Sequence, residues 1–411
     1  MSGRAHVLSM VLAGGEGKRL FPLTRDRAKP AVPFGGIYRI IDFVLSNLVN
    51  AHFRRIVVLT QYKSHSLDRH LAQTWRLSPL LGSYVAPAPA QMRRGPHWYS
   101  GSADAIYQNL NVIADERPDY VVVFGADHIY RMDPRQMLDY HIDKGAAVTV
   151  AAIPVPIGEA KSFGIIAADE TGKITEFLEK PDQAPAIRGS PDMALASMGN
   201  YIFTTEALEW AVKVDAKSRA SHHDMGGNII PMITQDQGAY VYDFAENQVP
   251  GLTERERGYW RDIGSLDAYY EASMDLVSVE PVFNFYNDEW PIYTWQFPWP
   301  PAKFVHDQDG RRGSAIDSLI ANGAVVSGGL VKRSIISPQV RVNSFAEVSD
   351  SVVLPGVIVG RGARVHRAII DKHVEIPPGY EIGTDLALDR ERFNISPGGI
   401  VVIGKSDKLP E

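Results

Sequence analysis

The sequence contains no cysteine, which excludes disulfide bonds and thiolate metal ligands. It also has no apolar run long enough to cross a membrane, and its first residues lack the apolar segment of a secretory signal. Basic residues are in slight deficit, with 42 lysines and arginines against 48 acidic residues. This balance argues against broad binding to nucleic acid. We therefore expect a cytoplasmic protein with no membrane and no nucleic-acid partner.

The chain of 411 residues is long enough for two domains or more, each with its own core. In the first 280 residues, short apolar runs alternate with helical patterns, and the runs lie at 7–12, 56–59, 120–124 and 148–153. Such alternation predicts an α/β domain with a largely parallel sheet. Ligands of such sheets bind at the carboxyl ends of the strands, so the loops after these runs are the places to search.

The composition changes at residue 281, where Phe, Tyr, Trp and Pro crowd together, and we interpret 281–313 as a packed linker. From 314 to 411 an apolar residue recurs every six positions. The rows are Val342, Val348, Leu354; Val353, Val359, Val365; and Ile370, Ile376, Ile382. A period of six with short strands is typical of a parallel β-helix, whose flat sides suit subunit contact. Unrelated β-turns are the alternative.

A glycine loop follows the first predicted strand, with Gly14, Gly15 and Gly17 directly after the run at 7–12. Glycines at a strand end, trailed by cations, are typical of a phosphate site. The cations here are Lys18, Arg19, Arg25, Arg27 and Lys29. The residue pattern of this loop matches neither a Walker A loop nor a dinucleotide-binding fingerprint. An ordinary strand-to-helix turn with surface cations remains the alternative.

Two acids stand where a metal could be held. Asp127 follows the strand at 120–124, and Asp262 lies between an aromatic residue and a glycine. Either carboxylate could be a ligand of a magnesium ion bound to a nucleotide. Alternatively, it could simply cap a helix or close a turn. Lys180 lies between Glu179 and a proline, and could bind an anion or merely pair with Glu179. The adjacent histidines His222 and His223 cannot easily face one ion, so we expect no metal there.

Further motifs lie close together at 12–20, 22–24, 27–32, 34–36, 39–43 and 45–47. On these the chain resembles the sugar-phosphate nucleotidyltransferases and, within them, the bacterial ADP-glucose pyrophosphorylases (glucose-1-phosphate adenylyltransferases). The resemblance extends from about residue 7 to about residue 404. It implies a Rossmann-like nucleotidyltransferase domain, with a mostly parallel sheet, followed by a left-handed β-helix. The implied reaction converts ATP and α-glucose 1-phosphate into ADP-glucose and pyrophosphate, for glycogen synthesis.

The resemblance also implies roles for single residues, which we transfer motif by motif. The catalytic residues would be Arg19, Lys29 and Asp127, and the ligands of Mg²⁺ would be Asp127 and Asp262. The nucleotide would meet Gly14, Gly15 and Gln91. Glucose 1-phosphate would meet Tyr99, Gly164, Glu179, Lys180 and Ser197. Arg27 and Arg39 would bind small anionic metabolites as allosteric effectors, and the assembly would be a homotetramer.

Three departures from the family pattern stand out. Ala126 replaces a glycine before Asp127, which is a small change. The segment 225–228 reads Met-Gly-Gly-Asn where many relatives have Phe-Gly-Lys-Asp, and its role is open. Asp26 stands where several relatives carry a cation for a sugar bisphosphate activator, so such an activator is expected to act poorly.

Two other functions stay open at this point. The first is the same chemistry with another base or sugar, against which Gln91 and the segment 39–42 argue. The second is a non-catalytic regulatory subunit. Such subunits usually lose an acid or the sugar lysine, whereas this chain keeps Asp127, Lys180 and Asp262, which favours an enzyme.

Overall fold

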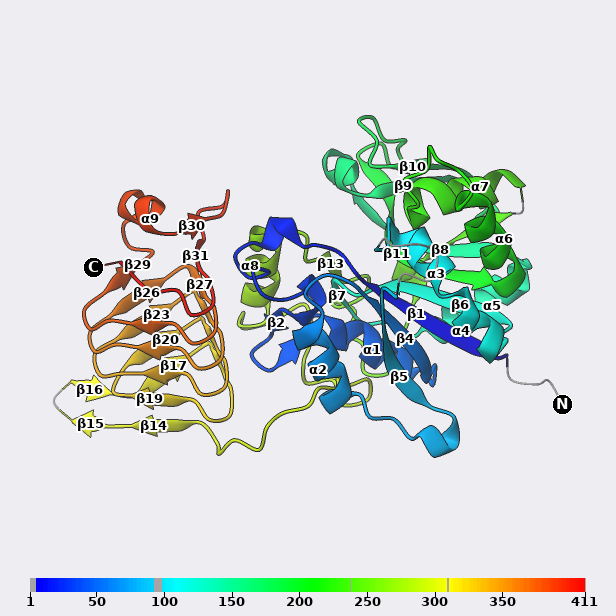
Figure 1. Ribbon diagram of the computed structural model, residues 1–411. Coiled ribbons are helices and arrows are strands. Elements are labelled where there is room, and N and C mark those ends of the chain that lie inside the picture. The colour runs from blue at the N-terminus through cyan, green and yellow to red at the C-terminus, as the bar shows by residue number, and fades with distance from the viewer. Residues whose placement is uncertain (1–4, 92–97, 237, 309, 411) are drawn as a thin grey trace.

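The computed structural model describes residues 5–91, 98–236, 238–308 and 310–410, and it shows an α/β domain beside a β-helix (Figure 1). The sheet of the α/β domain follows the path β10-β9-β11-β6-β1-β4-β5, and β8 and β12 pair off this path. The strands are β1 (Val7–Ala13), β4 (Arg55–Thr60), β5 (Tyr84–Pro89), β6 (Tyr120–Gly125), β8 (Val148–Pro156), β9 (Gly164–Ala168), β10 (Ile174–Glu179), β11 (Met193–Thr204) and β12 (Ala239–Asp243).

The half of the sheet around β1 is parallel. β1 pairs in parallel with β4 and β6, and β4 pairs in parallel with β5. The other half is organised around β11, which runs antiparallel to β6, β8 and β9. The α/β class is therefore confirmed, and the glycine loop leaves the carboxyl end of a strand in the parallel half.

The run at the start of the chain becomes a central strand because both its faces are apolar and covered. Met10 packs in one core cluster with Val123 and Ile106, and Val11 packs in another with Phe124. A strand buried on both faces reads as a continuous apolar run, as this one does. The helices of this domain are α1 (Ile41–Asn50), α2 (His65–Thr74), α3 (Ser102–Gln108), α4 (Leu110–Glu116), α5 (Pro134–Lys144), α6 (Thr205–Asp215), α7 (Ile230–Asp236) and α8 (Leu266–Asp275).

Two small ribbons lie beside the main sheet. β2 (Pro33–Phe34) pairs with β3 (Tyr38–Arg39), and β7 (His128–Tyr130) pairs antiparallel with β13 (Trp260–Asp262). Short helical turns complete the domain: η1 (Lys18–Leu20), η2 (Lys29–Ala31), η3 (Pro79–Leu81), η4 (Ile157–Ser162), η5 (Met225–Ile229) and η6 (Phe244–Glu246). No helix among the described residues has the length and apolar character needed to span a membrane.

Apart from β30, which pairs antiparallel with β31, the strands of the three C-terminal sheets stack in parallel into a left-handed β-helix, which confirms the predicted hexapeptide repeat. The predicted apolar rows point inward, since Val342, Val348, Val359 and Val365 are all buried. The first sheet holds β14 (Lys303–Val305), β19 (Val325–Ser327), β22 (Arg341–Val342), β25 (Ile358–Val359) and β28 (Glu375–Ile376). The second holds β17 (Ser314–Ile316), β20 (Leu330–Lys332), β23 (Glu347–Ser349), β26 (Arg364–His366) and β29 (Glu381–Ile382).

The third sheet closes the β-helix. It holds β18 (Leu319–Ile320), β21 (Ile335–Ile336), β24 (Val352–Val353), β27 (Ala368–Ile370), β31 (Val401–Ile403) and β30 (Asn394–Ile395). A separate hairpin joins β15 (Asp307–Gln308) to β16 (Arg311–Arg312), and α9 (Leu386–Arg392) lies near the C-terminus. Because β14 pairs with β19, a strand of the β-helix lies inside the segment predicted as linker. The domain bounds 1–280, 281–313 and 314–411 stay a prediction.

The two domains pack against each other through an apolar cluster and ion pairs. Leu354 and Ile369 of the β-helix share one buried cluster with Ile263 and Tyr269 of the α/β domain. At the same boundary the buried side chains of Arg27 and Asp371 are paired, with Nη2 2.9 Å from Oδ2. A buried arginine needs such a carboxylate partner, so this contact ties the glycine-loop region to the β-helix.

Candidate active site

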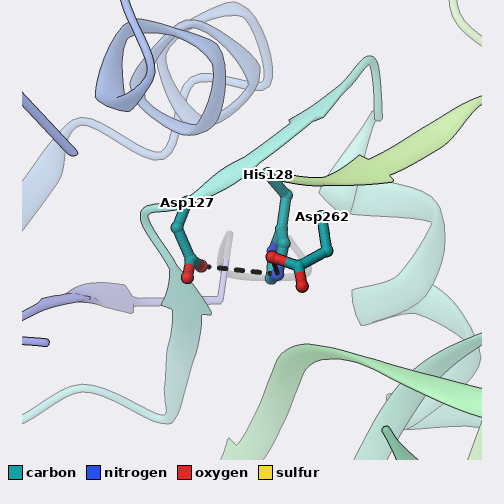
Figure 2. Close-up of side chains that lie close together, drawn as sticks. All are labelled: Asp127, His128 and Asp262. Atoms are coloured by element: carbon teal, nitrogen blue, oxygen red, sulfur yellow. Dashed lines mark ion pairs between the residues drawn. The ribbon is translucent and has the colours of Figure 1, made fainter. Parts of the chain in front are cut away.

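An acid pair forms where the β7–β13 ribbon meets the end of β6. In this ribbon Asp262 lies opposite His128, and Asp127 directly precedes β7. Ligand atoms of Asp127, His128 and Asp262 therefore lie within 4.8 Å of one another. Figure 2 shows these three side chains close together. The His128 Nε2 atom is 3.3 Å from Asp127 Oδ1.

Lys29 places its ammonium group between the two carboxylates. Its Nζ atom lies 2.7 Å from Asp127 Oδ2 and 3.3 Å from Asp262 Oδ1. Burial disfavours the charged forms of both Asp127 and Lys29, but the attraction between their opposite charges outweighs the cost of burial. The pKa of Asp127 lies well below its usual range because Lys29 and His128 favour the carboxylate, and the pKa of Lys29 is raised by the two acids.

The residues of this cluster fit a divalent cation. Carboxylate oxygens are the ligands that Mg²⁺ prefers, and two of them converge here. The Asp127 side chain keeps 36% of its exposure, so an ion with its water ligands can reach it. The buried Nδ1 atom of His128 has no hydrogen-bond partner within the described part of the chain. Asp127 and Asp262 are therefore the residues that could hold a metal ion.

A cavity of about 340 Å³ opens from the acid pair across the carboxyl ends of the strands. It brings together seven of the residues proposed from the sequence: Arg19, Asp127, Gly164, Glu179, Lys180, Ser197 and Asp262. These come from elements scattered over most of the α/β domain. The cavity is therefore built from strands and loops that lie far apart in the sequence.

The wall of the cavity also carries the Glu179–Lys180 pair. Glu179 is the last residue of β10 and lies opposite Gly164 on β9. Its Oε1 atom contacts the Lys180 ammonium, and Lys180 has a positive φ of 47°. This left-handed turn directs the chain out of the strand, and both charged groups lie at the cavity wall.

The remaining proposed residues do not line this cavity. Gly14 and Gly15 follow β1, and no side chain in the described structure forces glycine at either position, since a Cβ would meet nothing closer than 3.5 Å. Gly17 differs, because its φ of 65° is one that glycine adopts easily. Tyr99 is buried, and its hydroxyl donates to the Ala88 carbonyl at 3.3 Å. Gln91 is exposed and borders a segment outside the described residues.

The two proposed effector residues lie at the domain boundary, each already engaged. Arg27 is paired with Asp371, and Arg39 donates through Nη1 to the Ser66 carbonyl at 3.0 Å. Burial lowers the pKa of Arg39 to about 10. Lys372 adjoins them, and burial together with Arg39 and Arg27 lowers its pKa to about 7. The three cations form a positive cluster between the domains.

Sequence reasoning missed several residues of the site. His128 follows Asp127 directly, so its position at a strand end was the available signal. Asp224 lines the cavity as well, in a segment for which the sequence favours no metal and whose departure from the family pattern leaves no contact to transfer. Ser102 and Gly226 also line the cavity, and Gly226 belongs to the segment 225–228, whose role the sequence leaves open.

The fold and the acid-lined cavity are those of a nucleotide-handling transferase, and comparison with known proteins agrees. Residues 8–279 match the nucleotidyl transferase family, and residues 300–403 match the GlmU-like, C-terminal hexapeptide family. The chain is 60% identical over 402 residues to a glucose-1-phosphate adenylyltransferase of Parafrankia sp. (strain EAN1pec), covering 97% of each chain. It is also 60% identical over 400 residues to the enzyme of that name from Mycolicibacterium smegmatis, covering 97% of this chain and 98% of the relative.

A third relative of the same name, from Corynebacterium jeikeium, is 57% identical over 407 residues, and the match covers 99% of each chain. These matches span both domains and almost the full length of each relative. The chain therefore belongs to the glucose-1-phosphate adenylyltransferase family of the nucleotidyl transferases.

Proposed function

We propose that the protein transfers the adenylyl group of ATP to α-glucose 1-phosphate, forming ADP-glucose and pyrophosphate for glycogen synthesis in the cytoplasm. One observation carries this proposal. A single cavity joins an acid pair suited to a metal–nucleotide complex with an acid–lysine pair suited to a sugar phosphate. The names of the full-length relatives support the same reaction.

The reaction forms one phosphorus–oxygen bond and breaks another. An oxygen of the sugar phosphate attacks the α-phosphorus of ATP in line, and the bond to the β-phosphate breaks, so that pyrophosphate leaves. Such a transfer depends on positioning and charge neutralisation rather than on a covalent nucleophile. Bound Mg²⁺, held by Asp127 and Asp262, would supply positive charge next to the phosphates.

Other residues of this chain bind the substrates and stabilise charge during the transfer. Gly14 and Gly15 let the nucleotide phosphates approach the backbone, and Gln91 faces the base. Arg19 and Lys29 offset charge on the leaving phosphates. The sugar phosphate binds to Lys180, and Glu179 accepts hydrogen bonds from sugar hydroxyls. Tyr99, Gly164 and Ser197 complete this sugar subsite.

We also propose regulation by small anionic metabolites at the domain boundary. Arg27, Arg39 and Lys372 supply a positive cluster there, and Arg27 already links the boundary to Asp371 of the β-helix. Because Arg27 lies two positions from Lys29 in the chain, an anion that competes with Asp371 for Arg27 acts close to the acid pair. This proximity is the physical basis that we propose for coupling.

We propose that the assembly is a homotetramer with the β-helix contributing to subunit contact. Stacked coils offer flat sides of this kind, and the family resemblance implies the same assembly. Sedimentation of the full-length protein tests the proposal. A monomer at micromolar concentration would contradict it.

The reaction itself is tested with purified protein, Mg²⁺, glucose 1-phosphate and each nucleoside triphosphate in turn. We expect pyrophosphate release with ATP, and little with UTP or GTP. Faster turnover with UTP or GTP would assign a different nucleotide. No turnover with any nucleotide would favour the regulatory-subunit alternative.

A further inference from the structure

Gly226 lines the cavity next to Glu179. It is buried in η5, a π-helical turn that also contains Gly227. A Cβ at position 226 would lie 2.7 Å from Glu179 Oε2 and 3.4 Å from Asp224 Oδ1. The first distance is below the van der Waals contact of carbon and oxygen. A side chain at position 226 would therefore have to displace the Glu179 carboxylate.

The backbone itself gives no reason for glycine at position 226. Its φ lies outside the left-handed region, and so does that of Gly227. A Cβ at position 227 would meet nothing closer than 3.6 Å, which is ordinary contact with Asp224 and Glu179. The two neighbouring glycines therefore differ in whether a side chain would press on the Glu179 carboxylate.

The turn that carries Gly226 cannot easily move away from Glu179. Asp224 Oδ1 accepts from the Gly227 amide at 2.8 Å, and Asp224 Oδ2 accepts from the Ser102 hydroxyl at 2.9 Å. The Met225 amide donates to the same hydroxyl at 2.8 Å. These bonds fix η5 to the first turn of α3. A side chain at position 226 would therefore displace the flexible end of Glu179 rather than the turn.

Gly164 borders Glu179 from the other side, but it is a poorer place to intervene. A Cβ there would lie 2.6 Å from the Phe177 ring, which packs in the main core cluster. Substitution of Gly164 would disturb the core, whereas substitution of Gly226 meets only the carboxylate end.

We propose that Gly226 is a positioning residue for the sugar phosphate. By leaving room for the Glu179 carboxylate, it keeps Oε2 at the cavity wall while Oε1 contacts Lys180. The inference rests on the proposed function, in which Glu179 accepts hydrogen bonds from sugar hydroxyls. It also defines part of the segment 225–228, in which position 226 is restricted and position 227 is not.

The test compares Gly226→Ala with Gly227→Ala, a matched control in the same turn. Loss of a hydrogen bond to a charged group corresponds to roughly a ten- to hundredfold change. We expect Gly226→Ala to raise KM for glucose 1-phosphate by that factor, with KM for ATP and kcat changed by less than about threefold. Gly227→Ala should leave all three close to wild type. Equal KM values for Gly226→Ala and wild type would overturn the inference.

A double-mutant cycle shows whether the effect passes through Glu179. In a Glu179→Ala background, Gly226→Ala should raise KM for glucose 1-phosphate no further. An equal rise in both backgrounds would mean that the added methyl group blocks the sugar directly. Likewise, a loss of thermal stability in Gly226→Ala that Glu179→Ala does not restore would contradict the inference. An inactive wild-type protein would instead overturn the proposed function, and this inference with it.

Discussion

Lys29 Nζ lies 2.7 Å from Asp127 Oδ2 and 3.3 Å from Asp262 Oδ1, so a lysine bridges the two acids proposed to hold the metal. The Lys29 side chain is only 11% exposed, and its charge is thereby held where the acids meet. In the proposed reaction, the same lysine faces the nucleotide phosphates. Lys29 must therefore exchange one set of anionic partners for another as metal and nucleotide bind.

The first prediction concerns the acid at the end of β6. Asp127→Asn should preserve the fold, because the amide has nearly the same shape, and should lower magnesium-dependent turnover by roughly two to four powers of ten. Steady-state rates over a range of Mg²⁺ concentrations, together with thermal unfolding, measure both effects. Turnover within about tenfold of wild type, with unchanged magnesium dependence, would remove Asp127 from the metal site.

The second prediction concerns competition between Lys29 and the metal. Lys29→Met leaves two carboxylates facing each other without their cation, and their mutual repulsion should favour any divalent ion. We expect Mn²⁺ to bind the nucleotide-free variant roughly tenfold more tightly than wild type, since a unit charge at this range is worth at least that much. Paramagnetic resonance of free Mn²⁺ measures the affinity without turnover.

Lys18→Met provides the control for this experiment, because it removes a lysine paired with Glu16 in the same loop. It should leave Mn²⁺ affinity unchanged. If Mn²⁺ binds the Lys29 variant no more tightly than wild type, the lysine and the metal do not compete.

The sequence predicts individual parts of this site better than their contacts. Asp127 and Asp262 each follow a recognisable local pattern, and both line the cavity, while their roles stay a prediction. Lys29 and Asp127 are 98 positions apart, and no local pattern shows that they pair. The packing of two separate segments creates that contact, so only the folded chain reveals it.

The same limit applies to the domain boundary. The apolar period of six predicts the β-helix coils because each coil repeats the same burial, as Val342 and Val359 show. Arg27 and Asp371 lie 344 positions apart, and their pairing depends on how the two domains dock. Docking of the two domains also buries Lys372 beside Arg39 and Arg27. Its lowered pKa therefore cannot be predicted from the sequence alone.

The third prediction uses the titration of Lys372. Because its pKa is lowered to about 7, the ammonium is charged below that value and becomes neutral as the pH rises through it. Anion binding at the domain boundary should therefore weaken as pH rises. Sulfate is a suitable probe because it keeps its charge throughout. Between about pH 6.5 and about pH 8.5, we expect its affinity to fall on the order of tenfold.

Calorimetric titration with sulfate measures this dependence. In Lys372→Met, binding should be weaker at the lower pH, and its pH dependence should largely vanish. A variant that keeps the pH dependence of wild type would show that another group is responsible.

The last prediction concerns the acid next to this cluster. Asp26 is exposed and adjoins Arg27 in the chain. The pKa of Arg25 is raised mainly by its hydrogen bond to Asp407, and the charge of Asp26 adds to this. A carboxylate beside an anion site repels a doubly phosphorylated ligand more than a singly phosphorylated one. At a partly exposed site the Coulomb energy of two unit charges about 4 Å apart is a few kcal/mol before screening, as large as a typical allosteric coupling. Fructose 1,6-bisphosphate should therefore activate poorly, and a sugar monophosphate should activate better.

Activation by both ligands should be compared in wild type, Asp26→Lys and Asp143→Lys. The control residue Asp143 is exposed and belongs to α5. Helix α5 lies on the side of the α/β domain away from the β-helix (Figure 1). Asp26→Lys should improve activation by the bisphosphate more than activation by the monophosphate, because the added charge acts on two phosphates. Asp143→Lys makes the same change in net charge and should alter neither. Strong activation of wild type by fructose 1,6-bisphosphate, unchanged in Asp26→Lys, would place Asp26 outside the effector site, because a charge within it must affect the more highly charged ligand.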